Sequence, residues 1–220
     1  MALTAGDLLP MVKKLAASYL EEIGDDDGQQ NYYIFQYLTH SLRKLADIAY
    51  QQRESNPLYI SSDGDAVFMR GSSDITNMYA PLRILDPDGR ELTKRTSFAD
   101  SKGWWRESSN TQINIKGYGL ATQPLKPGNH ILQYIAYPDP IVSTTSPVQF
   151  PDAGTLGLCY YCAGLILESR PTAKDLVLHY MNIARGHLKI TVQANIAARG
   201  ASSGGYVPSL ATVDTAFGGA

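Results

Sequence analysis

The hydrophobic residues of this chain change their spacing twice, and that change constrains the fold more than any other feature of the sequence. Over about residues 7–52, and again over about 151–199, apolar side chains recur every three or four positions, as along one face of an α-helix. Over about 57–150 they alternate, as in half-buried β-strands. No helical pattern interrupts the strands, so we expect an antiparallel sheet. The order helix, sheet, helix predicts an α+β fold.

The first helical block is predicted to be a pair of helices. Pro10 is expected in the first turn of the first helix, where its missing N–H does no harm, and Gly24 is a typical C-terminal stop. Acidic residues 25–27 favour the start of the second helix, which ends before Asn56-Pro57. Because the connection between these helices is short, we expect an antiparallel hairpin.

The second helical block is also predicted to be a pair. Pro151 opens one helix and Pro171 opens the next, since proline suits the first helical turn. The last helix carries its apolar residues on one stripe: Leu176, Tyr180, Ile183, His187 and Ile190. Two helix pairs that flank a β insertion would most simply pack together as one antiparallel bundle.

The middle block contains short runs with strand periodicity, separated by turn sequences. Asp, Gly and Pro cluster between the runs, and Asp88-Gly89 predicts a β-hairpin. Strands this short, without intervening helices, favour a small antiparallel sandwich. The candidate strands are 58–60, 66–70, 78–85, 112–116 and 130–137.

These patterns predict the division of the 220-residue chain. Residues 1–55 and 151–199 are expected to form the helical bundle domain, 56–150 the inserted β domain, and 200–220 an extended C-terminal tail. A hydrophobic content of 44% is enough for a packed core. The formal net charge of −2 provides no basic patch for reading nucleic acid. We expect no secretory leader, because Asp7 and Pro10 lie where a signal peptide would have its apolar run. We expect no membrane contact, because the longest apolar run, 156–167, is too short to span a bilayer.

The residues that most often carry catalysis or bind metals are sparse. Cys159 and Cys162 are the only cysteines, and a zinc site needs four ligands. A redox pair would sit at a helix N-terminus after a strand, whereas these two lie inside an apolar helical run, so we interpret them as core residues. The acidic turns do not fit a calcium loop. The histidines are scattered along the sequence: His40, His130, His179 and His187. Without a recognisable nucleotide-binding or hydrolase motif, we expect no catalytic residues, no metal, no cofactor and no enzyme activity.

Two adjacent tryptophans in the β block have two interpretations. Trp104 and Trp105, followed by Arg106, could form a sugar platform or a partner contact on the β domain. The interpretation that we favour is that one covers the end of the sandwich core and the other lies over the helix junction, because aromatic burial dominates small β cores.

The C-terminal tail is unusual for a solvated terminus. After Arg199 it carries one charged side chain, Asp214, and a Gly/Ser-rich stretch over 201–205. Pro208 suits a first helical turn. Its apolar residues are spaced so that several would share one helical face, which predicts a tethered docking peptide; a disordered terminus is the alternative. The apolar residues are Tyr206, Val207, Leu210, Val213 and Phe217.

Across residues 3–199 the chain resembles the phage head–tail adaptor (connector) proteins, which form the first ring below the portal. TAGDLLPMVKKLAASYLEEIGDD, followed by YYIFQYLTHSLRKLADIAY, is similar to the family's opening helix pair. HILQYIAYPDPIVSTTSPVQFPDAGTLGLCYYCAGLILESR is similar to its last strand, a proline-marked crossover and the return into the third helix. The β insertion resembles the version found in adaptors of short-tailed phages.

This resemblance implies a structural protein of the virion, at the head–tail interface, assembled in the host cytoplasm. It implies a ring of twelve copies around a channel through which DNA passes without sequence-specific binding. The helical bundles would form the ring wall, the tail would dock on the portal protein, and the β domain would face the next tail or neck protein. The alternative function is a glycan-binding or host-recognition β module of a virion protein that uses the tryptophan pair; a hydrolase without a familiar motif is a third.

Overall fold

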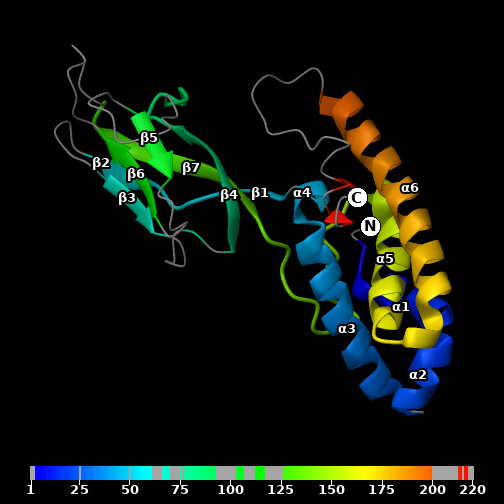
Figure 1. The fold of residues 1–220 in the computed structure, drawn as a ribbon. Helices are drawn as coiled ribbons and strands as arrows, with labels where there is room; N and C mark the ends of the chain where they lie inside the picture. Colours follow the sequence, from blue (N-terminus) through cyan, green and yellow to red (C-terminus); the bar gives the residue numbers. More distant parts are fainter. Residues whose placement is uncertain are drawn as a thin grey trace. The chain divides into compact units, whose positions relative to one another are not determined.

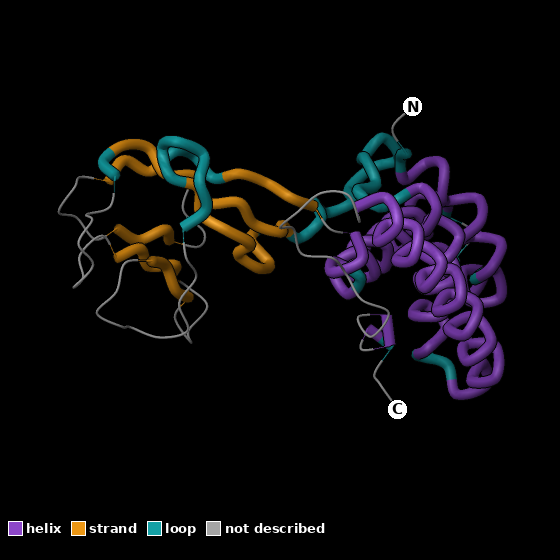
Figure 2. Tube along the Cα trace, turned by 90° about the horizontal axis from the view of Figure 1, so that it is seen from above, coloured by secondary structure: helices purple, strands orange, loops and turns teal. Residues whose placement is uncertain are grey.

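The computed structural model describes residues 3–24, 26–49, 51–60, 66–69, 75, 77–92, 103–106, 112–116, 126–199, 213, 214, 216 and 217. The chain forms two compact units. One combines Met1–Tyr50 with Pro138–Ala220 and holds the helices; the other is Gln51–Tyr137 and holds the strands (Figure 2). We call them the helical unit and the β unit. The predicted α+β class, with packed helices and a small antiparallel sheet, is confirmed.

The N-terminal part of the helical unit contains α1 (Ala5–Leu15), α2 (Ala17–Ile23), α3 (Asp27–Lys44) and α4 (Ala46–Ala49). The Thr4 N–H donates to the Asp7 carboxylate at 2.8 Å, and the Thr4 hydroxyl donates to it at 2.7 Å. This cap begins the helix earlier than the apolar pattern suggested, so Pro10 lies inside α1 rather than in its first turn. The helix is interrupted at Ala16, where ψ is 15°.

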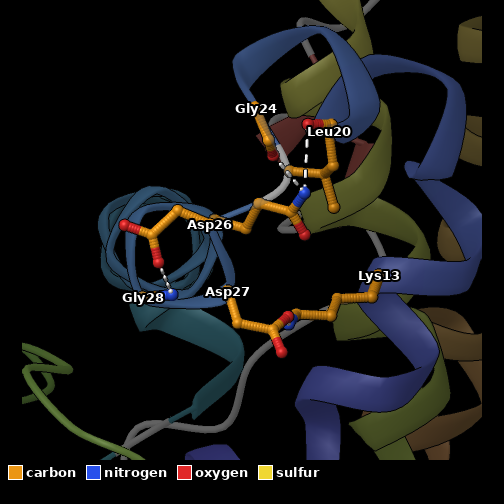
Figure 3. A network of polar contacts seen from close by, with 7 residues as sticks. Lys13, Leu20, Gly24, Asp26, Asp27 and Gly28 are labelled. Atoms are coloured by element: carbon orange, nitrogen blue, oxygen red, sulfur yellow. Dashed lines mark hydrogen bonds and ion pairs between the residues drawn. The ribbon is translucent and has the colours of Figure 1, made fainter.

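A compact turn joins α2 to α3 (Figure 3). Gly24 ends α2 with a φ of 124°, a conformation that favours glycine. The Gln30 side-chain amide donates to the Leu20 carbonyl at 3.2 Å and to the Gly24 carbonyl at 2.7 Å. Asp26 caps α3 by accepting from the Gly28 N–H at 2.8 Å. The side chains therefore satisfy the free backbone groups at both helix ends, as a tight hairpin requires.

The C-terminal part contains the 3₁₀ turn η1 (Asp152–Gly154), α5 (Thr155–Glu168), η2 (Pro171–Ala173) and α6 (Lys174–Arg199). Helices α5 and α6 lie side by side (Figure 1). A Cβ on Gly157 would come within 3.1 Å of Leu188 Cγ, so glycine permits this close approach. The predicted stripe of α6 is only partly buried: Leu176 is 39% and Ile190 59% exposed. Over 174–194, where the structure describes the side chains of α6, the buried positions are Ala184, Leu188, Thr191 and Val192.

The segment between the last strand and η1 packs within the helical unit. The Ala5 N–H donates to the Ser146 carbonyl at 3.0 Å, and the Gly6 N–H donates to the Thr144 carbonyl at 2.8 Å. The Ile141 N–H donates to the Thr39 hydroxyl at 2.9 Å. These bonds explain why the β unit ends at Tyr137 and not at the sequence-based boundary of 150. It begins at Gln51 and not at 56, because Gln51 pairs with Ala136 in the sheet.

The β unit contains a four-stranded sheet and a three-stranded sheet, both antiparallel. In the first, β7 pairs with β1, β2 and β4; in the second, β6 lies between β3 and β5. Because β7 has partners along its length, most of its residues are buried. The strands are β1 (Gln51–Glu54), β2 (Leu58–Ile60), β3 (Ala66–Met69), β4 (Met78–Leu85), β5 (Gly103–Arg106), β6 (Gln112–Lys116) and β7 (Gly128–Ala136).

The predicted strands are confirmed, with small shifts at the ends of β3 and β7. Around Asp88-Gly89 the predicted hairpin forms: the Leu92 N–H donates to the Ile84 carbonyl at 2.8 Å, and Gly89 has a φ of 76°. Two strands had no prediction, β1 and β5. The sequence QQRE of β1 shows no apolar alternation, and the prediction that the preceding helix continues through it is wrong.

Candidate functional site

The C-terminal tail returns to the helical unit at four described residues, Val213, Asp214, Ala216 and Phe217, which we call the C-terminal turn (Figure 1, red). Val213, Asp214 and Ala216 have helical backbone, and the Phe217 N–H donates to the Asp214 carbonyl at 3.2 Å. Val213 is completely buried and belongs to the core of the helical unit. Two of the predicted docking residues, Val213 and Phe217, therefore lie against the chain's own helices.

Helix α5 contributes an aromatic contact to the C-terminal turn. The rings of Tyr161 and Phe217 meet edge to face, with centroids 5.1 Å apart and an interplanar angle of 77°. The Tyr161 hydroxyl donates to the Ala216 carbonyl over 3.4 Å. Burial raises the pKa of Tyr161, and the nearby charge of Glu168 raises it further, so this hydroxyl remains a donor at neutral pH.

Helix α6 contributes charge to the same turn. Lys189 Nζ lies 2.9 Å from Asp214 Oδ1, and Arg185 Nε lies 3.8 Å from the same oxygen. The Arg185 guanidinium carbon also lies 5.3 Å from the centre of the Phe217 ring, within the range of a cation–π interaction. Arg185 and Lys189 are four residues apart, so they share one face of α6 and together meet Asp214, the single acidic side chain of the tail.

Beside the C-terminal turn lies a groove of about 720 Å³, lined by residues of α3, α5 and α6. Its apolar lining includes Leu165, Met181 and Phe217. Basic side chains outnumber acidic ones: Lys44, Arg170, Lys174 and Arg185 line it, against Glu168. An apolar groove with basic side chains suits a peptide that combines apolar residues with carboxylates.

The cysteines lie in the core, as we interpreted them. Cys159 and Cys162 are both free and buried. Burial raises the pKa of Cys159 to about 11, and it raises the pKa of Cys162 despite the opposing hydrogen bond from Ser41. Protonated, inaccessible thiols are poor nucleophiles and poor metal ligands, so neither residue is suited to reaction chemistry.

The histidines and acidic residues are not brought together. Within the described parts of the chain, no three His, Cys, Asp or Glu residues are placed so that they could hold a metal ion. His40 and His179 are exposed and His187 is half-buried. His130 is buried in β7, where its Nδ1 lies 3.0 Å from the Gly128 carbonyl.

A tyrosine cluster on α2 and α3 forms another polar network of the helical unit. The hydroxyls of Tyr19 and Tyr33 are 3.0 Å apart, and those of Tyr33 and Tyr37 are 3.3 Å apart. Burial, with hydrogen bonds from both neighbours, raises the pKa of Tyr33; the hydrogen bond with Tyr33 is the main cause that lowers the pKa of Tyr19. Arg170, which is paired with Glu22, lies 4.7 Å from the Tyr19 ring, so the cluster ties the α5–α6 connection to α2.

The remaining sequence candidates are placed only in part. Trp104, Trp105 and Arg106 lie in β5, opposite Ile115, Asn114 and Ile113 of β6, and the structure describes their backbone alone. Tyr206, Val207 and Leu210 lie outside the described residues. Sequence reasoning did not find the groove or the partners of the C-terminal turn. The one available signal was the basic pair Arg185 and Lys189, which share a helix face.

Comparison with known proteins adds no assignment. No protein-family model matches the chain, and no curated protein matches it. Among the described residues, no helix is long and apolar enough to cross a membrane.

Proposed function

We propose that this protein is a structural component of a virion, a head-to-tail adaptor. In this proposal twelve copies form a ring on the portal protein, the ring connects the portal to the next tail or neck protein, and DNA passes through its channel. The observation that carries the proposal is the insertion of a β unit into a helical unit built from both ends of the chain. This is the arrangement that the resemblance to phage adaptors predicts.

Exposed apolar side chains on α5 and α6 support self-assembly. Leu176 and Ile190 of α6, with the half-buried Ile183 between them, recur at seven-residue spacing and so share one face. Leu156 of α5 is 37% exposed. Subunit contacts bury such residues, and a ring closes when one face of a subunit meets a different face of the next.

The C-terminal turn supports the docking role that we assign to the tail. Val213 and Phe217 are four residues apart, and both contact helices through the same face of the turn. The segment therefore has the chemistry of a short helical docking peptide, with an apolar face and one acidic side chain. In the proposal, this segment and Tyr206, Val207 and Leu210 dock on the portal.

In the same proposal, the helical unit is an antiparallel bundle of two helix pairs and forms the ring wall. The two sheets of the β unit pack as a small sandwich that faces the next tail or neck protein. No catalytic step is assigned to the protein.

The decisive experiment mixes the full-length chain with its cognate portal protein and measures the native mass and the negative-stain image of the mixture. A ring stacked on the portal is the expected result. Folded protein that forms neither a ring nor a complex with the portal would contradict the proposal.

A point variant tests the tail within that assay. Phe217→Ser should weaken portal attachment, because it removes the aromatic side chain from the docking face. Deletion of 200–220 is a less clean test: it also removes the buried Val213 and would lower stability by about 1–3 kcal/mol. The thermal unfolding of each variant must therefore be measured beside its attachment.

A further inference from the structure

The C-terminal turn contacts the helical unit through both its apolar face and its polar side. Its apolar face is covered by the helical unit, where Val213 is fully buried and Phe217 packs on Tyr161. Its polar side meets α6, where Asp214 faces Lys189 and Arg185. A side chain that is buried against its own helices cannot contact a partner at the same time.

We propose that the C-terminal turn is an autoinhibitory latch: the apolar residues that dock on the portal are held on α5 and α6 until the portal surface displaces this contact. The inference rests on the proposed function and deepens it, because it assigns the portal-binding peptide a second, intramolecular site. The occupant of that site is the chain's own Val213, Asp214, Ala216 and Phe217.

The contacts are those of a reversible latch. The side chains of Asp214, Lys189 and Arg185 are each between about a third and a half exposed, at 46%, 37% and 36%, so water screens their ion pairs. Such exposed pairs change an equilibrium by roughly two- to fivefold. Arg185 Nε is buried, yet among the described residues it has no hydrogen-bond acceptor, since Asp214 is 3.8 Å away. The closed state therefore leaves a donor unsatisfied, and the guanidinium is available to a better-placed carboxylate.

A latch has a quantitative consequence for docking. A partner that binds only the open tail sees an apparent dissociation constant divided by the fraction of molecules that are open. Weakening the latch without touching the docking residues must therefore tighten portal binding. A tail that is merely disordered and always available would show no such gain.

The first test changes the helix and leaves the tail intact. Lys189→Glu replaces attraction to Asp214 with repulsion and should lower the dissociation constant for the portal by about two- to fivefold. Lys14→Glu is the matched control, since it makes the same charge change on an exposed residue of α1 outside the groove, whereas Asp214 pairs with Lys189 and Arg185. Equal affinities of wild type and Lys189→Glu, or equal gains in both variants, would overturn the latch.

A second readout does not require the portal. Chymotrypsin cleaves after aromatic residues in extended backbone, so it should cleave after Phe217 faster once the turn has left Tyr161. Mass spectrometry should therefore find that residues 218–220 are lost several-fold faster from Lys189→Glu than from wild type or Lys14→Glu. Identical rates in the three proteins would show that the charged contact does not hold the turn.

A third test holds the C-terminal turn closed with a crosslink, which should have the opposite effect on portal binding. Lys189→Cys combined with Asp214→Cys, joined by a short bismaleimide, should lose portal binding, while the same protein without the linker should bind. The buried native thiols do not compete for the reagent. If the locked protein binds as well as the unlocked one, the latch is wrong. If the unlocked protein and wild type both fail to bind, the adaptor function itself fails, and the portal-docking role of the latch falls with it.

Discussion

Arg185 shows how one side chain serves several contacts at the C-terminal turn. Its guanidinium lies over the Phe217 ring and near the Asp214 carboxylate, while its neighbour one turn on, Lys189, provides the shorter ion pair. A planar guanidinium stacks on an aromatic ring more effectively than an ammonium group does. Lysine at position 185 would therefore keep the charge and weaken the contact with Phe217.

At the same scale, burial of Cys159 makes stability depend on pH. The thiol has a pKa of about 11 in the folded protein against an ordinary value of 9.0, because burial disfavours the thiolate. Below pH 9 the thiol is protonated in both states. Above pH 9 the unfolded chain releases this proton and the folded chain keeps it, so the free energy of unfolding falls as pH rises towards 11.

Replacing this cysteine should flatten the pH dependence. In Cys159→Ala the decline of the unfolding free energy between pH 9 and pH 11 should be shallower than in wild type, by up to about 1.4 kcal/mol per pH unit. Urea unfolding at several pH values measures this slope. As a control, maleimide should label neither thiol of native wild type at pH 8 in the time that it labels both in urea. Parallel slopes for the two proteins would show that Cys159 is not the group involved.

At the scale of elements, the contact between α5 and α6 depends on small residues. Gly157 faces Ala184 and Leu188, and a Cβ there would lie 3.3 Å from the Ala184 carbonyl oxygen. Gly186 is on the same helix as Ala184, but no heavy atom within 4 Å would meet its Cβ. The two glycines therefore have different roles: one permits packing, and the other only weakens a helix.

Substitution of these glycines should change stability in opposite directions. Gly157→Val should lower the free energy of unfolding by about 1–3 kcal/mol, because the added methyl groups must separate α5 from α6. Gly186→Ala should raise it by about 0.5–1 kcal/mol, since alanine favours the helix and nothing opposes its methyl group. Chemical denaturation followed by circular dichroism measures both. A loss of stability in Gly186→Ala would contradict the open environment that the structure gives this position.

At the scale of the whole molecule, two cores stabilise two units. The described core residues of the helical unit all come from residues 1–50 and 138–220, and those of the β unit all come from 51–137. The β unit begins and ends in paired strands, with Gln51 opposite Ala136. In an antiparallel pair these two Cα atoms are about 5 Å apart, so a short linker can replace the whole unit.

The helical unit should therefore fold alone. A chain in which a short Gly/Ser linker joins residues 1–50 to 138–220 should show a helical circular dichroism spectrum and a cooperative thermal transition. The excised β unit, 51–137, provides the complementary sample. A linked helical protein that melts without cooperativity would show that its core needs the β unit.

The last prediction concerns the association of many copies of the chain into the proposed ring. Ile190→Asp should leave the stability of the monomer within about 0.5 kcal/mol of wild type, because Ile190 is 59% exposed. In the proposed ring it should weaken subunit association by roughly 10- to 100-fold, since it places a charge in an apolar contact. Gln36→Asp on the exposed side of α3 adds the same charge elsewhere and should assemble normally. Sedimentation velocity of wild type, Ile190→Asp and Gln36→Asp at matched concentration distinguishes these outcomes. Unaltered assembly of Ile190→Asp would show that this face of α6 is not part of the ring interface.

The sequence by itself determined the element types and the turns. The 3.6-residue period predicted the helices, alternation predicted five of the strands, and Gly24, Gly89 and Pro171 marked boundaries. These signals are local, because burial on one face and the conformational preferences of glycine and proline act over a few residues. The strand β1, polar and without alternation, gave no such signal.

Tertiary structure decided what local patterns cannot encode. The buried face of α6 follows from the approach of Gly157 on α5. The end of the β unit follows from hydrogen bonds of residues 141–146 with the backbone of residues 5 and 6 and with the Thr39 hydroxyl. The position of the C-terminal turn likewise depends on Tyr161, Arg185 and Lys189, all distant from it in the sequence. Each of these is a long-range contact, and its geometry exists only after the elements have packed.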